Sequence, residues 1–319
     1  MKILVTGGAG FIGSHIVDAY IEARHDVVVI DTLETGHLEN VNGAARFYKM
    51  DVRDAELSKL FAAERFDVVN HQAARGNVRG SMEAPGIYAD VNIIGGVNLL
   101  ECSRKNAVKK FIYSSTGGCV YGEPQYLPAD EAHPLCPRDP YGASKASFEL
   151  YLPVYMMNYG LKYTALRYPN VFGPRQDPLG EAGVVSIFIG QMLRDIQPVT
   201  NGDGEQLRDY VFVSDVVRAN VLVLESGDNE VFNLGWGKGI SVNKIFEALK
   251  EILRNEMPEL HGPAKLGEVR QTFLSSEKAR RVLGWSPVVR LEEGLRRTVE
   301  FFQSSGQLLK QEDSELRAK

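Results

Sequence analysis

A tyrosine and a lysine four residues apart, Tyr141 and Lys145, form the pair best suited to proton chemistry in this sequence. Residues at i and i+4 share one face of a helix, so the two groups would lie close together. A phenol titrates near pH 10, and a base useful near neutrality needs that pKa lowered by about three units, or about 4 kcal/mol. An ammonium about 5 Å away supplies about 3.3 kcal/mol at an effective dielectric constant near 20. The pair is therefore a candidate acid–base group, although the lysine alone supplies slightly less than the free energy needed to lower the pKa of the phenol.

Three glycines, Gly7, Gly10 and Gly13, follow the apolar run Ile3 to Thr6 and lead into an amphipathic stretch from Phe11 to Arg24. This order predicts a buried strand, a tight turn and a helix. The first glycine provides freedom in φ, the second lets the backbone approach a pyrophosphate, and the third lets helix and strand pack closely. The N–H groups and dipole at the helix start favour a phosphate. The stretch is typical of a dinucleotide site, which includes Phe11 and Ile12.

An acid closes the next apolar run, DVVVID, at Asp31, 18 residues after Gly13. This is about where a dinucleotide-binding fold places the carboxylate that hydrogen-bonds the adenosine ribose. No Arg or Lys occurs between Asp31 and Arg46 to bind a 2′-phosphate, so NAD is favoured over NADP. A third run ends at Asp51 and Val52, which we expect beside the adenine.

Alternating apolar and amphipathic segments predict repeated strand–helix units up to Tyr168, and hence an α/β fold with a Rossmann-like, doubly wound parallel sheet. We expect one helix over 84–106 and another over 141–159, with Pro153 inside it. Residues 1–168 would form the NAD-binding domain, 169–302 mainly a smaller substrate-binding domain, and 303–319 a polar, mobile tail. Segments within about 205–235, including 210–213 and 231–234, are expected to return to the main sheet.

Composition narrows the class of protein. The chain has 319 residues, 44% of them hydrophobic, and a net charge of -5, which disfavours nucleic acid and anionic membranes as general partners. No apolar run is long enough to span a bilayer, and the early first strand leaves no room for a signal peptide, so we expect a cytoplasmic protein. Three cysteines without CxxC spacing indicate free thiols, with no disulfide framework and no metal site.

The ordered set of glycine loop, acid, hydroxyl run SSTGGCVYGE and YGASK resembles the extended short-chain dehydrogenase/reductase family. That family's pattern implies that Tyr141 is the acid–base catalyst, that Lys145 tunes it and holds the nicotinamide ribose, and that Thr116 hydrogen-bonds the substrate. Ser115 stays open as the alternative hydroxyl, because this run has one residue more than the commonest version. The resemblance also implies cofactor contacts for Ala73, Ala74, Asn92, Ser114 and Tyr168.

Later segments resemble the nucleotide-sugar epimerase/dehydratase branch of this family. RYPNVFGPRQDP, GEAGVVSIF and GDGEQLRDYVFVSD carry the likeness, together with the region around Arg270. By this resemblance, Asn170, Val184, Arg208 and Arg270 contact the nucleotide diphosphate. The sugar-nucleotide 4,6-dehydratases carry an Asp–Glu pair where this chain has Gly117 and Gly118, so dehydration is disfavoured.

Within that branch the motifs are most similar to those of UDP-glucose 4-epimerases. The implied activity is NAD-dependent inversion of C4 of a nucleotide sugar, with UDP-glucose and UDP-galactose favoured, by a protein that is a homodimer like its family. Arg75 adds positive charge after His71, near the expected sugar pocket, so a UDP-glucuronate 4-epimerase stays open. Another decarboxylase, reductase or dehydratase of the family is the further enzymatic alternative, and an NAD-binding sensor without turnover represents a different class.

Overall fold

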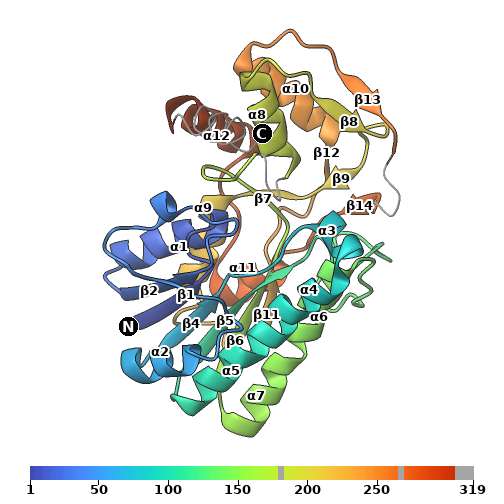
Figure 1. The fold of residues 1–319 in the computed structure, drawn as a ribbon. Coiled ribbons are helices and arrows are strands. Elements are labelled where there is room, and N and C mark those ends of the chain that lie inside the picture. Colours follow the sequence, from blue (N-terminus) through green and yellow to red (C-terminus); the bar gives the residue numbers. More distant parts are fainter. Residues whose placement is uncertain (179–182, 265–268, 306–319) are drawn as a thin grey trace.

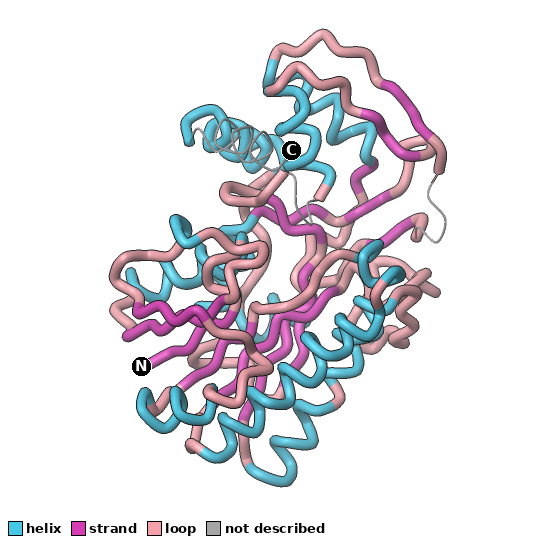
Figure 2. Tube along the Cα trace, in the orientation of Figure 1, coloured by secondary structure: helices cyan, strands magenta, loops and turns pink. Residues whose placement is uncertain are grey.

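The computed structural model describes residues 1–178, 183–264 and 269–305, and it has a seven-stranded parallel sheet at its centre. The strand order is β11-β6-β5-β4-β1-β2-β3 (Figures 1 and 2), which reverses at β1 as in a doubly wound fold. The strands are β1 (Lys2–Thr6), β2 (Asp26–Asp31), β3 (Arg46–Lys49), β4 (Val68–His71), β5 (Lys110–Thr116), β6 (Lys162–Tyr168) and β11 (Glu230–Asn233). The Rossmann-like α/β fold predicted from the sequence is confirmed.

Side chains from successive strand positions enter two different apolar clusters, because alternate residues of a strand face opposite sides. In β1, Ile3 and Val5 join one cluster, whereas Leu4 joins the other. Helices α1 (Phe11–Glu22), α9 (Val213–Leu222) and α11 (Glu277–Leu283) cover the first face. Helices α2 (Leu57–Glu64), α5 (Gly95–Lys105), α6 (Pro140–Glu149) and α7 (Tyr151–Tyr159) cover the second. The central strands are buried on both sides and hold their carboxyl ends in fixed register.

Both long predicted helices are interrupted. The segment predicted as 141–159 divides into α6 and α7 at Leu150, because Pro153 has no N–H to donate to the carbonyl of Glu149. The segment predicted as 84–106 consists of α4 (Pro85–Ala89), a π-helical turn (Asp90–Ile94) and α5. π-Turns inside helices are frequent at functional sites, and this one contains the buried Asn92. The two interrupted helices run side by side on the front of the sheet in Figure 1.

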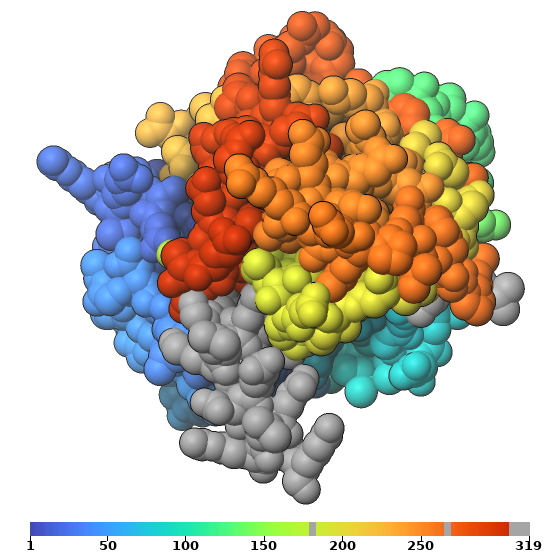
Figure 3. Space-filling model, turned by 90° about the horizontal axis from the view of Figure 1, so that it is seen from above, coloured from blue at the N-terminus to red at the C-terminus, as the bar shows by residue number. Residues whose placement is uncertain are grey.

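A smaller unit lies over the carboxyl edge of the sheet. Seen from above (Figure 3), the segments from α8 onward, yellow to red, cover the middle of the molecule. Three short elements follow strands of the main sheet: a 3-10 turn (Leu38–Asn40) after β2, α3 (Val78–Glu83) after β4 and β7 (Asn170–Phe172) after β6. The unit's own elements are α8 (Val184–Leu193), β8 (Val199–Asn201), β9 (Leu207–Arg208), β10 (Tyr210–Phe212), β12 (Ile240–Ser241), α10 (Val242–Leu253), β13 (Leu260–Gly262), β14 (Gln271–Thr272) and α12 (Leu291–Ser305).

The later segments return to the main sheet only in part. Strand β11 pairs with β6, whereas β10, in the segment 210–213, pairs with β7 in a separate two-stranded sheet. The prediction that 210–213 returns to the main sheet was therefore wrong. Its partner β7 begins at Asn170, just beyond the end of β6, and lies outside the main sheet. The predicted tail begins at 303, but residues 303–305 belong to α12 (Leu291–Ser305), and residues 306–319 lie outside the described residues. The division into domains at 168 and 169 stays a prediction.

Candidate active site

A cavity of about 940 Å³ opens between the carboxyl ends of the strands and the smaller unit. The glycine loop forms one end of it. Gly7 has φ +70°, and a Cβ there would lie 2.6 Å from the nitrogen of Ala73. A Cβ on Gly13 would lie 2.1 Å from the carbonyl oxygen of Gly7, whereas a Cβ on Gly10 would meet only that oxygen, at 3.3 Å. Gly7 and Gly13 are thus required by the protein's own packing, and Gly10 keeps its open side toward the cavity.

Replacing Gly10 by alanine separates these two requirements. We expect Gly10→Ala to weaken NAD binding at least tenfold, because the methyl group enters the space where the backbone must approach the pyrophosphate. Thermal unfolding of the apoprotein should change little, since nothing lies within 3 Å of the added Cβ. Gly13→Ala is the matched comparison and should lower the unfolding temperature. Titration of the apoproteins with NAD measures the affinity, and unchanged affinity in Gly10→Ala would place the dinucleotide elsewhere.

Asp31 joins the glycine loop to the loop after β2. Its carboxylate accepts hydrogen bonds from the nitrogens of Ala9 (3.0 Å) and Leu33 (2.8 Å) while it lines the cavity. Asp51 and Val52 line the same end of the cavity. The guanidinium of Arg53 holds the pKa of Asp51 below its usual range and also pairs with Asp90. This rim is acidic apart from guanidinium groups already bound to carboxylates, which suits ribose hydroxyls better than a second phosphate.

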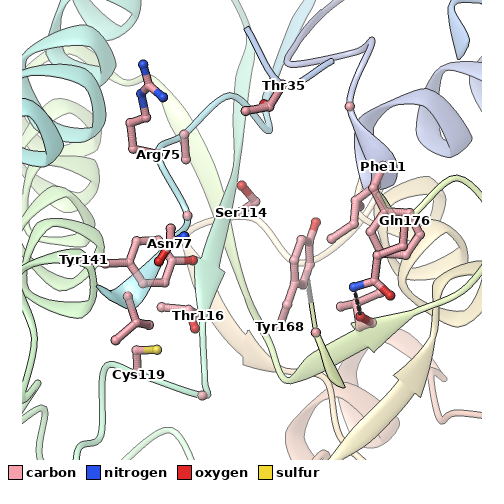
Figure 4. A pocket seen from close by; sticks show the side chains of 18 of the residues that line it. Phe11, Thr35, Arg75, Asn77, Ser114, Thr116, Cys119, Tyr141, Tyr168 and Gln176 are labelled. Carbon is pink, nitrogen blue, oxygen red and sulfur yellow. Dashed lines mark hydrogen bonds between the residues drawn. The ribbon is translucent and has the colours of Figure 1, made fainter. Parts of the chain in front are cut away.

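Successive residues of β5 face opposite sides of the sheet, so its three hydroxyl side chains have different surroundings. The strand continues to Thr116. Ser114 donates to the carbonyl of His71 at 3.0 Å, and Ser115 donates to the carboxylate of Glu149. Thr116 lies beside Tyr141 and Cys119 in the cavity (Figure 4). Thr116 is therefore the hydroxyl placed next to the phenol, whereas Ser115 is bound to a buried acid.

Helix α6 presents Tyr141 and Lys145 to this point. Asp139 caps the helix by accepting a hydrogen bond from the nitrogen of Gly142 at 2.7 Å, and Pro140 occupies the first turn. The Lys145 side chain is buried; its Nζ donates to the carbonyl of Ser114 at 2.8 Å and lies 4.9 Å from the ring centroid of Tyr113. Burial lowers the pKa of Lys145 to about 7, and the carboxylate of Glu149 opposes this shift. The positive charge of Lys145, which would lower the pKa of Tyr141, is thus disfavoured by burial and favoured by Glu149.

A buried ion pair behind α6 was not anticipated from the sequence. Arg167 of β6 donates through Nε (3.0 Å) and Nη2 (2.6 Å) to both oxygens of Glu149, and through Nη1 to the hydroxyl of Tyr121 (2.8 Å). The two charged side chains are only 5% and 6% exposed. Glu149 lies one turn beyond Lys145, so the i+4 spacing was visible, but its partner on another strand was not. The pair fixes α6 against β5 and β6.

The other predicted cofactor residues line the same cavity, except for the buried Asn92. Ala73, Ala74 and Tyr168 line it, and the Tyr168 hydroxyl accepts hydrogen bonds from Asn220 (2.9 Å) and Gln72 (3.2 Å). Asn92 lies behind the loop after β4 and donates to Ser144 of α6 at 2.8 Å. His71, in contrast, is a structural residue, because burial lowers its pKa to about 3 and its Nδ1 lies 2.7 Å from Thr6 Oγ1.

On the substrate side, Asn170, Val184 and Arg208 line the cavity that also contains Tyr141. Arg270 does not: it lines a smaller cavity of about 230 Å³ and grips Asp203 through two nitrogens, at 2.8 and 3.0 Å. Arg75 lines the main cavity, but its guanidinium binds Glu34, and Figure 4 shows it pointing away from Tyr141 and Thr116.

The two glycines after Thr116 have different surroundings. A Cβ on Gly117 would lie 2.2 Å from a methyl carbon of Leu274, so no larger residue fits there without rearrangement. A Cβ on Gly118 would have only Asn170 and Thr116 nearby, both at 3.7 Å. Gly118 therefore leaves open space between the hydroxyl and the amide, where a bound ring could lie.

Comparison with known proteins shows the family of this chain. The model of the NAD dependent epimerase/dehydratase family matches residues 3–235. A solved UDP-glucose 4-epimerase from Thermotoga maritima, with UDP-glucose, is 51% identical, covers 96% of this chain and 99% of its own, and has a TM-score of 0.94. A Thermus thermophilus UDP-glucose 4-epimerase in complex with NAD is 42% identical over 96% of this chain and 100% of its own, with a TM-score of 0.91. UDP-glucose 4-epimerase of Mycolicibacterium smegmatis is 42% identical over 96% of this chain and 100% of its own.

Proposed function

Because the chain belongs to the NAD dependent epimerase/dehydratase family, we propose that it interconverts UDP-glucose and UDP-galactose by inverting C4 of the sugar. One observation carries the proposal: the glycine loop and Asp31 at one end of the cavity, and Asn170, Val184 and Arg208 at the other, meet at Tyr141. The open side of Gly10 and the acceptor groups at the rim fit NAD as the resident cofactor. NAD, when bound, accepts hydride from C4 of the sugar and returns it.

The chain's own residues then handle the proton and the turning of the sugar. Tyr141 takes the proton from the 4-hydroxyl as the C4–H bond breaks, and Thr116 hydrogen-bonds the same oxygen. The ammonium of Lys145 stabilises the phenolate form of Tyr141, which is the form that receives this proton. Arg208 and Asn170 hold the diphosphate, so the 4-keto sugar can turn about that linkage and present its other face. Tyr141 returns the proton when the hydride returns, so atoms and electrons balance over the cycle.

The alternatives are less well supported by the geometry. A uronate substrate would need a cation at its carboxylate, but Arg75 points away from Tyr141 and Thr116 (Figure 4). A dehydratase would need acids where Gly117 and Gly118 stand, and Gly117 has no space for one. A sensor without turnover would not need the set of Thr116, Tyr141 and Lys145 in one cavity.

The test is incubation of the purified protein with UDP-glucose, UDP-galactose, UDP-glucuronate and the N-acetyl sugars, without added NAD. We expect UDP-glucose and UDP-galactose to interconvert, with no loss of water or carbon dioxide. Faster conversion of UDP-glucuronate would instead favour the uronate epimerase. Net release of a keto sugar or of reduced cofactor would contradict an epimerase.

We also propose a homodimer and a cytoplasmic location. Apolar side chains at helical spacing are exposed along the two interrupted helices: Leu150 (68%), Val154 (44%) and Met157 (69%) beside Ile87 (50%) and Ile94 (58%). A second copy of the chain would cover them. All three cysteines are free, which suits a reducing compartment. No helix in the described part of the chain is long and apolar enough to cross a membrane.

A charged residue on this face should separate the subunits. We expect Val154→Glu to convert the dimer to a monomer at micromolar concentration, because a carboxylate would be buried without a partner in the interface. Val282→Glu on α11 is the matched control, since Val282 is also 44% exposed. Light scattering after size-exclusion chromatography measures the mass. A Val154→Glu protein with unchanged mass would exclude this face as the interface.

A further inference from the structure

An ion pair joins Arg75 and Glu34 across the end of the main cavity that contains the glycine loop. We call this end of the cavity the groove, and it is where the cofactor is expected to bind. Glu34 belongs to the loop after β2, and Arg75 to the loop after β4. Strand β1 lies between these two strands in the sheet, so the glycine loop that follows β1 lies between the two loops. Both charged residues line the main cavity. The pair therefore joins the two walls of the groove on either side of the expected pyrophosphate site.

A side chain holds the backbone at or next to each end of this ion pair. The backbone nitrogen of Arg75 donates to Asn92 Oδ1 at 2.8 Å, and its carbonyl accepts from Asn92 Nδ2 at 3.0 Å. Asn92 is itself buried in the π-helical turn. On the other wall, Asp31 accepts from the nitrogen of Leu33, next to Glu34 in the chain. The backbones are thus held in place, and only the two side chains need to move for the groove to open.

The ion pair between Arg75 and Glu34 is exposed enough to solvent to open readily. The side chains of Arg75 and Glu34 are 35% and 48% exposed, so solvent and salt weaken their attraction. The nearby Asp51 is already bound by Arg53, so it competes little for Arg75. Arg75 points away from Tyr141 and Thr116 (Figure 4), so its charge acts at the groove and not at the reacting carbon.

We propose that Arg75 and Glu34 form a clasp that closes over the bound dinucleotide and slows its release. This inference rests on the proposed function, in which NAD stays bound between turnovers. The clasp must open each time the dinucleotide leaves, so its strength adds to the barrier for release. An exposed ion pair contributes about 0.2 to 1 kcal/mol, and loss of the pair should therefore speed release by up to about fivefold.

The test measures release directly, without turnover. The full-length protein is loaded with radiolabelled NAD, mixed with excess unlabelled NAD, and the label that stays bound is followed over time. We expect Arg75→Gln and Glu34→Gln each to release NAD about 1.4- to fivefold faster than wild type, and both by the same factor. The double variant should match the single variants. The charge-swapped variant, Arg75→Glu with Glu34→Arg, should return to within about twofold of wild type. High salt should speed release from wild type more than from Glu34→Gln.

The control and the contrary results are distinct. Arg280→Gln removes an exposed pair with Glu277 on α11, outside the cavity, and should leave release unchanged. Wild-type release in Glu34→Gln would overturn the clasp even if Arg75→Gln were faster, because Arg75 would then act on the dinucleotide directly. A wild-type protein that retains no label would refute NAD as a resident cofactor, which is a failure of the proposed function itself.

Discussion

Tyr141→Phe should lower kcat by about a hundred- to ten-thousandfold while the protein still binds NAD. The phenolic oxygen is the group that exchanges a proton with the sugar, and a positioned acid–base group contributes about 10² to 10⁴ in rate. Phenylalanine keeps the ring and removes only this oxygen. Lys145 and Thr116 stay in place around it, so binding should change little.

The measurement is a steady-state assay of UDP-galactose conversion, with bound NAD determined on the same preparation. Tyr126→Phe is the control, because this exposed tyrosine lies in a loop and donates to Asp130 at 2.8 Å, outside the lining of the main cavity. Its kcat should equal that of wild type. A Tyr141→Phe protein that keeps more than a few per cent of activity would require another acid–base group.

Arg167→Met should cost about 3 to 5 kcal/mol of the free energy of unfolding. The substitution leaves Glu149 buried, with the Ser115 hydroxyl as its hydrogen-bond donor among the described side chains. A buried charge without an opposite charge is costly. Typical domains have only about 5 to 15 kcal/mol of stability, so the protein would lose a large share of it.

Removing both charged side chains should cost less free energy of unfolding than removing Arg167 alone. A double variant, Arg167→Met with Glu149→Leu, removes both charges and should recover much of the lost stability. Urea unfolding measures wild type, the two single variants and the double variant, with Arg280→Met as an exposed control that should match wild type. If the double variant were as unstable as Arg167→Met plus Glu149→Leu measured singly, the two side chains would not act as a pair.

Local patterns account for the parts of the site that could be predicted from the sequence. Gly7, Gly10 and Gly13 follow a strand at fixed spacing, and Tyr141 and Lys145 are one helical turn apart, so short-range geometry determines where they lie. The break at Leu150 also had a local cause in Pro153. Strands β4 and β5 include His71 and Thr116 because these residues pair with Tyr113 and Tyr168 of neighbouring strands, which is not a local property of the sequence.

Partners of long charged side chains could not be predicted in the same way. Arg75 was expected near the sugar and Arg270 near the diphosphate, but they bind Glu34 and Asp203. A guanidinium can reach carboxylates on several loops, and loop positions depend on the whole fold. The Arg167–Glu149 pair likewise joins a strand to a helix that only the tertiary structure brings together. The roles of these site residues stay predictions until variants are measured.

The central claim is that hydride leaves C4 of the sugar and returns to the same carbon within one active site. UDP-galactose with deuterium at C4 tests it most directly, in a reaction with purified protein and no added NAD. We predict that nearly all of the UDP-glucose formed keeps deuterium at C4, as measured by mass spectrometry and NMR. Loss of the label to solvent during conversion would contradict hydride transfer, and with it the proposed role of Tyr141 beside a resident NAD.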